Sequence, residues 1–178
     1  MLTLHHERGL VLSIISRTTK VILLVVMSLY LAACPMQLAP LYDKAIVDGI
    51  TSTNKSIMVL FASASTGTTA ETFNTRSDAY NNVIGSIDAL EIQSKARPIP
   101  KSGVLDEVNK YLDKRGVPAV SNSEIPSATA LDGISKTLTM MRNTDKKQGL
   151  TATEVQAFKN QTDIYMDQAI TYESFLQR

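Results

Sequence analysis

The clearest helical pattern in the chain lies in residues 151–176, which read TATEVQAFKNQTDIYMDQAITYESFL. Apolar or small side chains recur there at alternating steps of three and four, at Val155, Phe158, Thr162, Tyr165, Ala169, Tyr172 and Leu176. This spacing places them on one face of an α-helix, as in helices that pack against other helices. Thr151 and Glu154 have the spacing of a capping box, which predicts where this helix begins.

The same periodicity predicts two long helices in the first half of the chain. The first starts at Leu38 or Leu41 and runs for about 25 residues. The second begins at a capping box formed by Thr68 and Glu71 and stops near Arg97, where a Pro-Ile-Pro segment removes backbone donors.

A short amphipathic helix is expected next, ending at Arg115 and Gly116. Residues 117–126 are predicted to form a loop, after which a further long helix runs from Ser127 to a stop at 146–149. No window shows sustained alternation of apolar and polar residues, so no strand is expected. We therefore predict an all-α fold, an antiparallel helical bundle of four long helices plus one short helix.

The N-terminal segment differs in character from the rest of the chain. Its densest apolar run, Val21–Ala33, is 13 residues long and follows Arg17 and Lys20. About 20 apolar residues are needed for a helix to cross a bilayer. A positive flank, a short apolar run and small residues at its end are typical of a secretory signal peptide instead.

The residues that close this run are Leu31, Ala32, Ala33 and Cys34. They resemble the lipobox of bacterial lipoproteins, in which Leu, a small residue, Ala or Gly, and Cys follow in that order. The resemblance implies that the Cys34 thiol receives a diacylglyceryl group, that the preceding peptide is removed, and that the new amino terminus is acylated, for example with palmitate. The alternative is that Cys34 is a small buried apolar residue, a common fate of a lone cysteine.

The expected organisation is a cleaved signal peptide at 1–33, a lipidated tether at 34–40 and a helical bundle domain at 41–178. Residues 1–20 are long for a charged leader, which suggests that translation starts downstream of Met1. Pro35, in place of Asp after the cysteine, resembles lipoproteins that are passed on to the outer membrane. We therefore expect a lipid-anchored protein of the cell envelope on the periplasmic face of the outer membrane.

Composition excludes several classes of function. The chain has 178 residues, one cysteine and two histidines, and both histidines lie in the leader. Removing residues 1–33 takes three of the 18 basic and one of the 17 acidic residues, leaving 15 and 16 and a formal charge of −1. A mature chain without histidine or a free thiol cannot use Ser-His-Asp or Cys-His catalysis or His-ligated metals. We expect no catalytic residue, metal, cofactor or nucleic-acid partner.

Carboxylates four or three residues apart are the first candidate sites. Asp163 and Asp167 have the spacing of a pair that shares a proton or a cation, as do Asp88 and Glu91. Asp163 and Asp167 fall off the apolar stripe of the last helix. For both pairs a solvated face is therefore the favoured interpretation.

The remaining candidates are cations, tyrosines and loops. Arg142, Lys146 and Lys147 could dock an anionic partner, although cations in a last turn usually complement the helix dipole. The tyrosines are expected in the core with their hydroxyls at its rim, at Tyr42, Tyr80, Tyr111, Tyr165 and Tyr172. Residues 98–100 and 117–126 flank the short helix and are the best place for a variable binding surface.

Three functions remain open from the sequence. The first is a structural or interaction module of the envelope, held to the membrane through lipid on Cys34 and contacting other envelope proteins. The second is a small-ligand-binding bundle with a pocket between its helices. The third, a carboxylate- or Ser/Lys-dependent cell-wall hydrolase, lacks an acid and a base at motif spacing. We favour the first.

Overall fold

The computed structural model describes residues 40–99, 102–120 and 124–177, and all regular secondary structure within these ranges is helical. The helices of these ranges are α2 (Lys44–Ala64), the 3-10 helix η1 (Ala70–Thr75), α3 (Ser77–Lys95), α4 (Ser102–Lys114), α5 (Pro126–Gln148) and α6 (Ala152–Phe175). The prediction of an all-α fold with four long helices and one short helix is confirmed.

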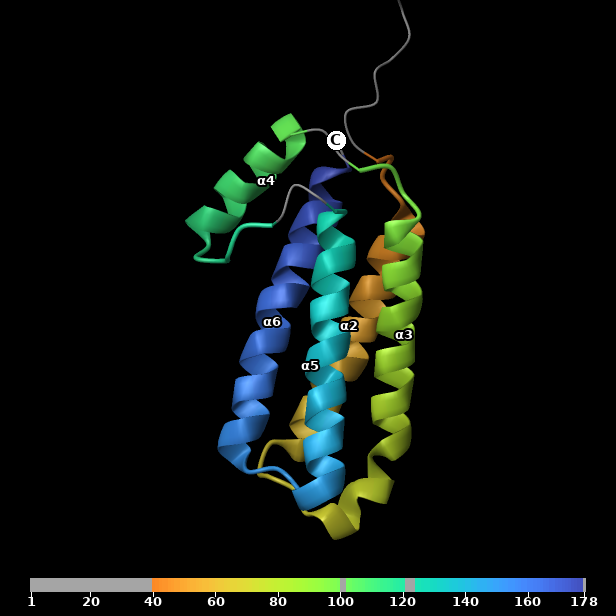
Figure 1. Cartoon of the computed structure of the whole chain (residues 1–178), viewed down its shortest axis with the longest axis vertical. Coiled ribbons are helices and arrows are strands. Elements are labelled where there is room, and N and C mark those ends of the chain that lie inside the picture. The colour runs from red at the N-terminus through yellow and green to blue at the C-terminus, as the bar shows by residue number, and fades with distance from the viewer. Residues whose placement is uncertain (1–39, 100–101, 121–123, 178) are drawn as a thin grey trace, which may run out of the picture. The chain divides into compact units, whose positions relative to one another are not determined.

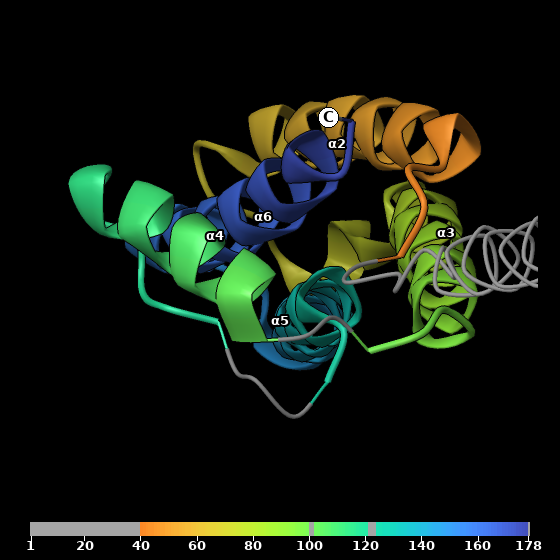
Figure 2. The same ribbon diagram turned by 90° about the horizontal axis from the view of Figure 1, so that it is seen from above.

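The four long helices run up and down to form an antiparallel bundle (Figure 1). Seen from above, α2, α3, α5 and α6 follow one another around a common core (Figure 2), and each contacts its two neighbours in that order. The N-terminal end of α2 and the C-terminal end of α6 lie at one end of the bundle, which we call the proximal end (Figure 1). The opposite end, the distal end, carries η1 and the α5–α6 turn.

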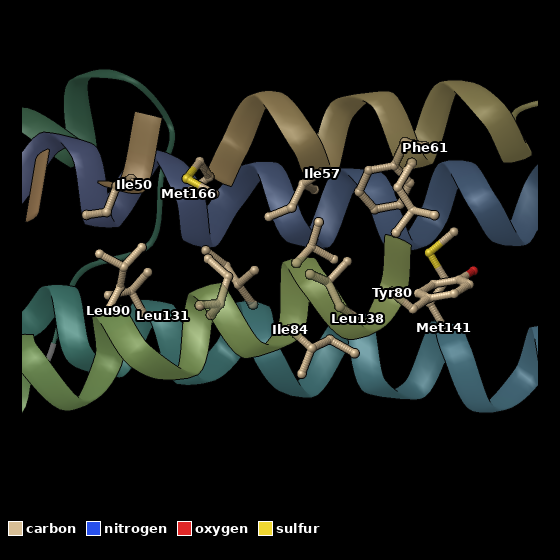
Figure 3. Packing of buried hydrophobic residues seen from close by; sticks show 14 of the residues in the cluster. Ile50, Ile57, Phe61, Tyr80, Ile84, Leu90, Leu131, Leu138, Met141 and Met166 are labelled. Carbon is tan, nitrogen blue, oxygen red and sulfur yellow. The ribbon is translucent and has the colours of Figure 1, made fainter. Parts of the chain in front are cut away.

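Apolar side chains from all four long helices meet in the centre of the bundle (Figure 3). The largest members of this core are almost inaccessible to solvent and include Ile50, Ile57, Leu60, Tyr80, Ile87, Leu131, Ile134 and Leu138. Each such side chain contributes about 1.5–3 kcal/mol through burial. The predicted stripes therefore do converge, and their burial is the main source of stability of the bundle.

Helix α2 begins later than predicted, at Lys44 rather than at Leu38 or Leu41. The side chain of Asp43 accepts a hydrogen bond from the Ala45 amide at 2.8 Å, and this cap sets the start of the helix. Leu41 lies before the cap and is exposed, whereas Leu38 lies outside the described residues.

The capping box predicted at Thr68 and Glu71 is wrong. The Thr68 hydroxyl donates to Asp145 at 2.5 Å instead, and the chain forms η1 before α3 begins at Ser77. Glu71 has a lowered pKa because its carboxylate accepts hydrogen bonds from a backbone amide and from the Thr69 side chain. The six residues of η1 turn the chain at the distal end, which delays the start of α3.

The capping box predicted at Thr151 and Glu154 is confirmed. The Thr151 hydroxyl accepts from the Glu154 amide at 3.2 Å, while the Glu154 carboxylate accepts from the Thr151 amide at 2.8 Å. The backbone hydrogen bond from Thr151, followed by that from its hydroxyl, lowers the pKa of Glu154. The cap starts α6 one residue later, at Ala152.

Two distal loops are joined directly to each other beside this cap. The Thr68 amide donates to the Leu150 carbonyl at 2.7 Å, and the Leu150 amide donates to the Thr68 hydroxyl at 2.9 Å. Gly149 has a φ of 79°, and a Cβ atom there would lie 2.4 Å from the Thr68 carbonyl oxygen. Only glycine is compatible with this close approach of the two loops. The contact connects the loop after the C-terminal end of α2 to the α5–α6 turn.

Helix α4 packs against α6 and forms a second, smaller core. Leu105, Val108 and Leu112 are fully buried on its inner face, against Tyr172 and Leu176 of α6. The segment after α4 is held to it by two hydrogen bonds between the Asn109 side chain and the Val120 backbone. Asn109 Nδ2 donates to the Val120 carbonyl at 3.3 Å, and the Val120 amide donates to Asn109 Oδ1 at 2.8 Å. All described residues belong to one compact unit.

Candidate functional site

A buried ion pair links η1 and α3 to α5 at the distal end. Arg76, immediately before α3, donates from Nε to Asp145 Oδ2 and from Nη2 to Asp145 Oδ1, both at 2.9 Å. The Asp145 side chain is completely buried and that of Arg76 is 10% exposed. This two-bond geometry is the strongest form of an arginine–carboxylate pair. It fixes the two elements at a set distance from each other.

Two further donors complete the environment of Asp145. The Thr68 hydroxyl lies 2.5 Å from Oδ1 and the Tyr80 hydroxyl 3.2 Å from Oδ2. Burial alone would raise the pKa of Asp145, but the hydrogen bonds from Arg76 and Thr68 outweigh it, and the pKa is lowered. Burial, together with the Asp145 charge, raises the pKa of Tyr80. The carboxylate is therefore charged and fully partnered at neutral pH.

A groove of about 400 Å³ is lined by residues that lie within five positions of Arg76 or Asp145 in the sequence. We call it the distal groove. Its hydrophilic lining residues are Asn74, Ser77 and Asn81 on one wall and Arg142, Asn143 and Lys146 on the other, with Phe73 also contributing. Ser77 follows Arg76 and Lys146 follows Asp145, so the ion pair holds both walls in position.

The structure brings together two of the three cations that were predicted to dock an anionic partner. Arg142 and Lys146 line the distal groove, whereas Lys147 is not among its lining residues. Arg142 Nη1 donates to Asn81 Oδ1 across the groove at 3.2 Å. Neither Arg142 nor Lys146 forms an ion pair with a described acidic residue.

A second buried ion pair lies at the proximal end. Arg97 Nη1 donates to Glu173 Oε2 at 3.0 Å, Nη2 donates to Glu173 Oε1, and Nη2 also donates to Ser127 Oγ at 3.0 Å. The Glu173 side chain is 1% exposed. The Arg97 Nε and Tyr172 hydroxyl groups lack a hydrogen-bond partner in the part of the chain that the structure describes. Burial raises the pKa of Tyr172.

The carboxylate pairs predicted from spacing do not act as pairs. Asp163 binds Lys159 on its own helix at 2.7 Å, and Asp167 binds Arg115 at 2.8 Å. Each carboxylate therefore has its own cation. The favoured interpretation of a solvated face holds only in part for Asp167, whose side chain is 24% exposed.

Asp88 and Glu91 are likewise separated by their partners. Asp88 accepts a hydrogen bond from the Ser135 hydroxyl of α5 at 2.5 Å, while Glu91 forms an ion pair with Lys95. The first contact joins α3 to α5 and the second stays within α3.

The tyrosines occupy three different environments. Tyr80 and Tyr172 are fully buried, Tyr42 and Tyr165 pack partly buried against the two cores, and Tyr111 is 47% exposed. The expectation of hydroxyls at the rim of the core is wrong for the first two, and the expectation of a core position is wrong for Tyr111. The hydroxyl of Tyr80 lies inside because Asp145 provides a buried acceptor.

The predicted binding surface around α4 is only partly described, because residues 100–101 and 121–123 lie outside the described ranges. A shallow pocket of about 360 Å³ is present on α4, with Lys110, Tyr111 and Lys114 among its lining residues. The Tyr111 ring packs edge-on against Phe175 at 5.4 Å and lies under the Arg115 guanidinium at 5.9 Å. These contacts hold α4 against α6.

The predicted lipobox, Leu31, Ala32, Ala33 and Cys34, lies outside the described residues. Within the described residues, His, Cys, Asp and Glu side chains form no group of three or more that could hold a metal ion. Among the helices in this part of the chain, none has the length and apolar character needed to cross a membrane.

Both buried ion pairs were missed by sequence reasoning, although a signal for the distal pair exists. Asp145 continues the predicted stripe of α5 one step beyond Met141. Arg76 occupies the step between Phe73 and Tyr80. A charged residue at a stripe position predicts a buried charge that needs a partner.

No family model, curated protein or solved structure matches this chain.

Proposed function

We propose that this chain is a lipid-anchored structural or interaction module of the bacterial cell envelope, with no catalytic activity. The observation that carries the proposal is the sequence Leu31-Ala32-Ala33-Cys34 at the end of a 13-residue apolar run with a positive flank. Cys34 is the only cysteine of the chain, so the thiol at this position has no disulfide partner within it. Two or more acyl chains on the mature amino terminus would make membrane anchoring stable.

Chain length adds a geometric consequence to lipidation at Cys34. The described bundle begins at Pro40, six residues later. Six extended residues span at most about 20 Å. The proximal end of the bundle would therefore stay close to the bilayer surface. Helix α2, with 21 residues, is about 30 Å long, so the distal end would point away from the membrane.

The described carboxylates support a non-catalytic role. Those that sequence spacing singled out are each occupied by a separate cation or hydroxyl, at Asp163, Asp167, Asp88 and Glu91. The two most buried carboxylates, Asp145 and Glu173, bind arginines that join elements of the fold. A hydrolase would need an acid and a base converging on one substrate-accessible point.

The proposal is tested by replacing Cys34 with Ser in cells that are fed a labelled fatty acid. The parent chain should incorporate the label and sediment with membranes after the leader is removed. The Cys34→Ser variant should take up no label and should keep its leader. Gln37→Ser, three residues away, is the matched control and should behave as the parent. A labelled, fully processed Cys34→Ser variant would refute lipid attachment at this residue.

Sorting is tested separately by Pro35→Asp. If the residue after the lipidated cysteine directs the chain to the outer membrane, this variant should be labelled as strongly as the parent but should move to the inner-membrane fraction. An unchanged distribution would refute the outer-membrane assignment and leave lipid attachment standing.

A further inference from the structure

We propose that the distal groove binds a small phosphorylated sugar or polyol, with the phosphate held by Arg142 and Lys146. Three properties of the groove lead to this ligand class: its charge, the free hydrogen-bonding capacity of its walls, and the fixed position of those walls.

The charge of the groove is positive and locally unbalanced. Two of its lining residues, Arg142 and Lys146, are cations, and no carboxylate lines it. The nearest buried acid, Asp145, is already neutralised by Arg76 and accepts from four donors in total. A phosphate carries close to two negative charges at neutral pH. It therefore matches the two unpaired cations better than a singly charged carboxylate does.

The two cations are arranged to act on one anion. Arg142 and Lys146 are four residues apart on α5, so their side chains project from the same helix face. The guanidinium of Arg142 is oriented by its hydrogen bond to Asn81 at 3.2 Å. Its remaining N–H groups stay available, and guanidinium groups bind phosphate through two parallel hydrogen bonds.

The rest of the lining suits hydroxyl groups. Asn74, Ser77 and Asn143 line the groove, and their side chains form no hydrogen bond with another described residue. Asn and Ser side chains both donate and accept, which is what a sugar hydroxyl requires of its partner. At about 400 Å³ the groove is within the size range of small-molecule sites.

The walls are held before any ligand arrives. The ion pair between Arg76 and Asp145 fixes the start of α3 against the last turns of α5, and Phe73 is buried beside it. A ligand that binds between walls of this kind loses little affinity to ordering of the protein.

The test is isothermal titration calorimetry of the full-length chain in a neutral detergent. Three probes are used: glucose 6-phosphate, inorganic phosphate and glucose. Glucose 6-phosphate should bind more tightly than either of the others. Arg142→Gln and Lys146→Gln should each weaken its binding about tenfold or more, because each removes a charged hydrogen-bond donor.

Lys147→Gln is the matched control, since it removes the same charge from the same helix turn outside the groove lining. It should change the affinity less than twofold, and all three variants should keep the helical circular dichroism of the parent. No binding of glucose 6-phosphate, equal binding of inorganic phosphate, or an equal loss in Lys147→Gln would each overturn the proposal. The Cys34→Ser variant should bind as the parent does, so this test is independent of lipid attachment.

Discussion

Replacing Asp145 with Asn tests whether the buried ion pair holds the distal end together. The carboxylate accepts two hydrogen bonds at each oxygen, from Thr68 and Arg76 at Oδ1 and from Arg76 and Tyr80 at Oδ2. An amide keeps one acceptor oxygen and replaces the other by a donor. Whichever way it turns, two of the four hydrogen bonds are lost and Arg76 is left charged without an anion.

The expected loss is large on the scale of a small domain. Breaking a buried ion pair by removing one charge costs about 3–5 kcal/mol. The free energy of unfolding of a typical domain is only about 5–15 kcal/mol. The Asp145→Asn variant should therefore lose about a fifth or more of the free energy of unfolding.

Urea unfolding, followed by helical circular dichroism at pH 7, measures this loss. The control is Asp163→Asn, which removes the same charge from a half-exposed pair with Lys159 and should cost about 0.5 kcal/mol or less. The double variant Arg76→Met with Asp145→Leu should recover most of the loss, because it leaves no unpaired charge.

The pH dependence provides a second check on the same residue. The pKa of Asp145 is lowered in the folded state, so its contribution is complete above the unfolded pKa of about 3.9 and disappears as the pH falls through the lower folded value. The stability gap between the parent and Asp145→Asn should therefore shrink below about pH 4. A gap under about 1 kcal/mol at pH 7, or one that persists unchanged at pH 2, would refute the reasoning.

Three further variants test other parts of the fold by urea unfolding. Gly149→Ala should lower the free energy of unfolding by about 3 kcal/mol, because residue 149 has a positive φ and a Cβ atom there would clash with the Thr68 carbonyl oxygen. A loss below about 1 kcal/mol would contradict the close contact between the two distal loops. Thr151→Ala should cost about 1 kcal/mol through loss of the α6 cap, and an unchanged midpoint would speak against the cap. Tyr172→Phe should be at least as stable as the parent at pH 7, since the hydroxyl it removes has no partner among the described residues. Because burial raises the folded pKa of Tyr172, the parent should lose stability as the pH rises above about 10, and this variant should lose less. Equal losses in both would contradict that assignment.

The helices could be predicted from the sequence because a helix is encoded locally. The three- and four-residue spacing of apolar side chains determines which face of α6 is buried, and the Thr151–Glu154 cap is contained within four residues. Both can be identified without knowledge of any partner helix.

The elements that were mispredicted depend on distant residues. Thr68 fits a local capping box, but its hydroxyl binds Asp145, 77 positions away, and that contact has no local signature. The 3-10 helix η1 forms where the chain turns to bring Arg76 to the same carboxylate. Local pattern identifies the buried face of a helix but not the residue that it will meet there.

The distal groove likewise depends on contacts between residues that are distant in the sequence. The sequence placed Arg142, Lys146 and Lys147 together as three equivalent cations at a helix end. Only the packing of α3 against α5 separates them, because it brings Asn81 to Arg142 and leaves Lys147 outside the lining. Which two of the three cations line the groove is therefore determined by tertiary packing, which the local sequence pattern does not reveal.

The intact mass of the mature protein is the decisive measurement for lipid attachment at Cys34. Purified from membranes, the chain should have the mass of residues 34–178 plus a diacylglyceryl group and an amide-linked acyl chain. A mature chain that begins at any other residue, or that carries an unmodified Cys34, would contradict the claim.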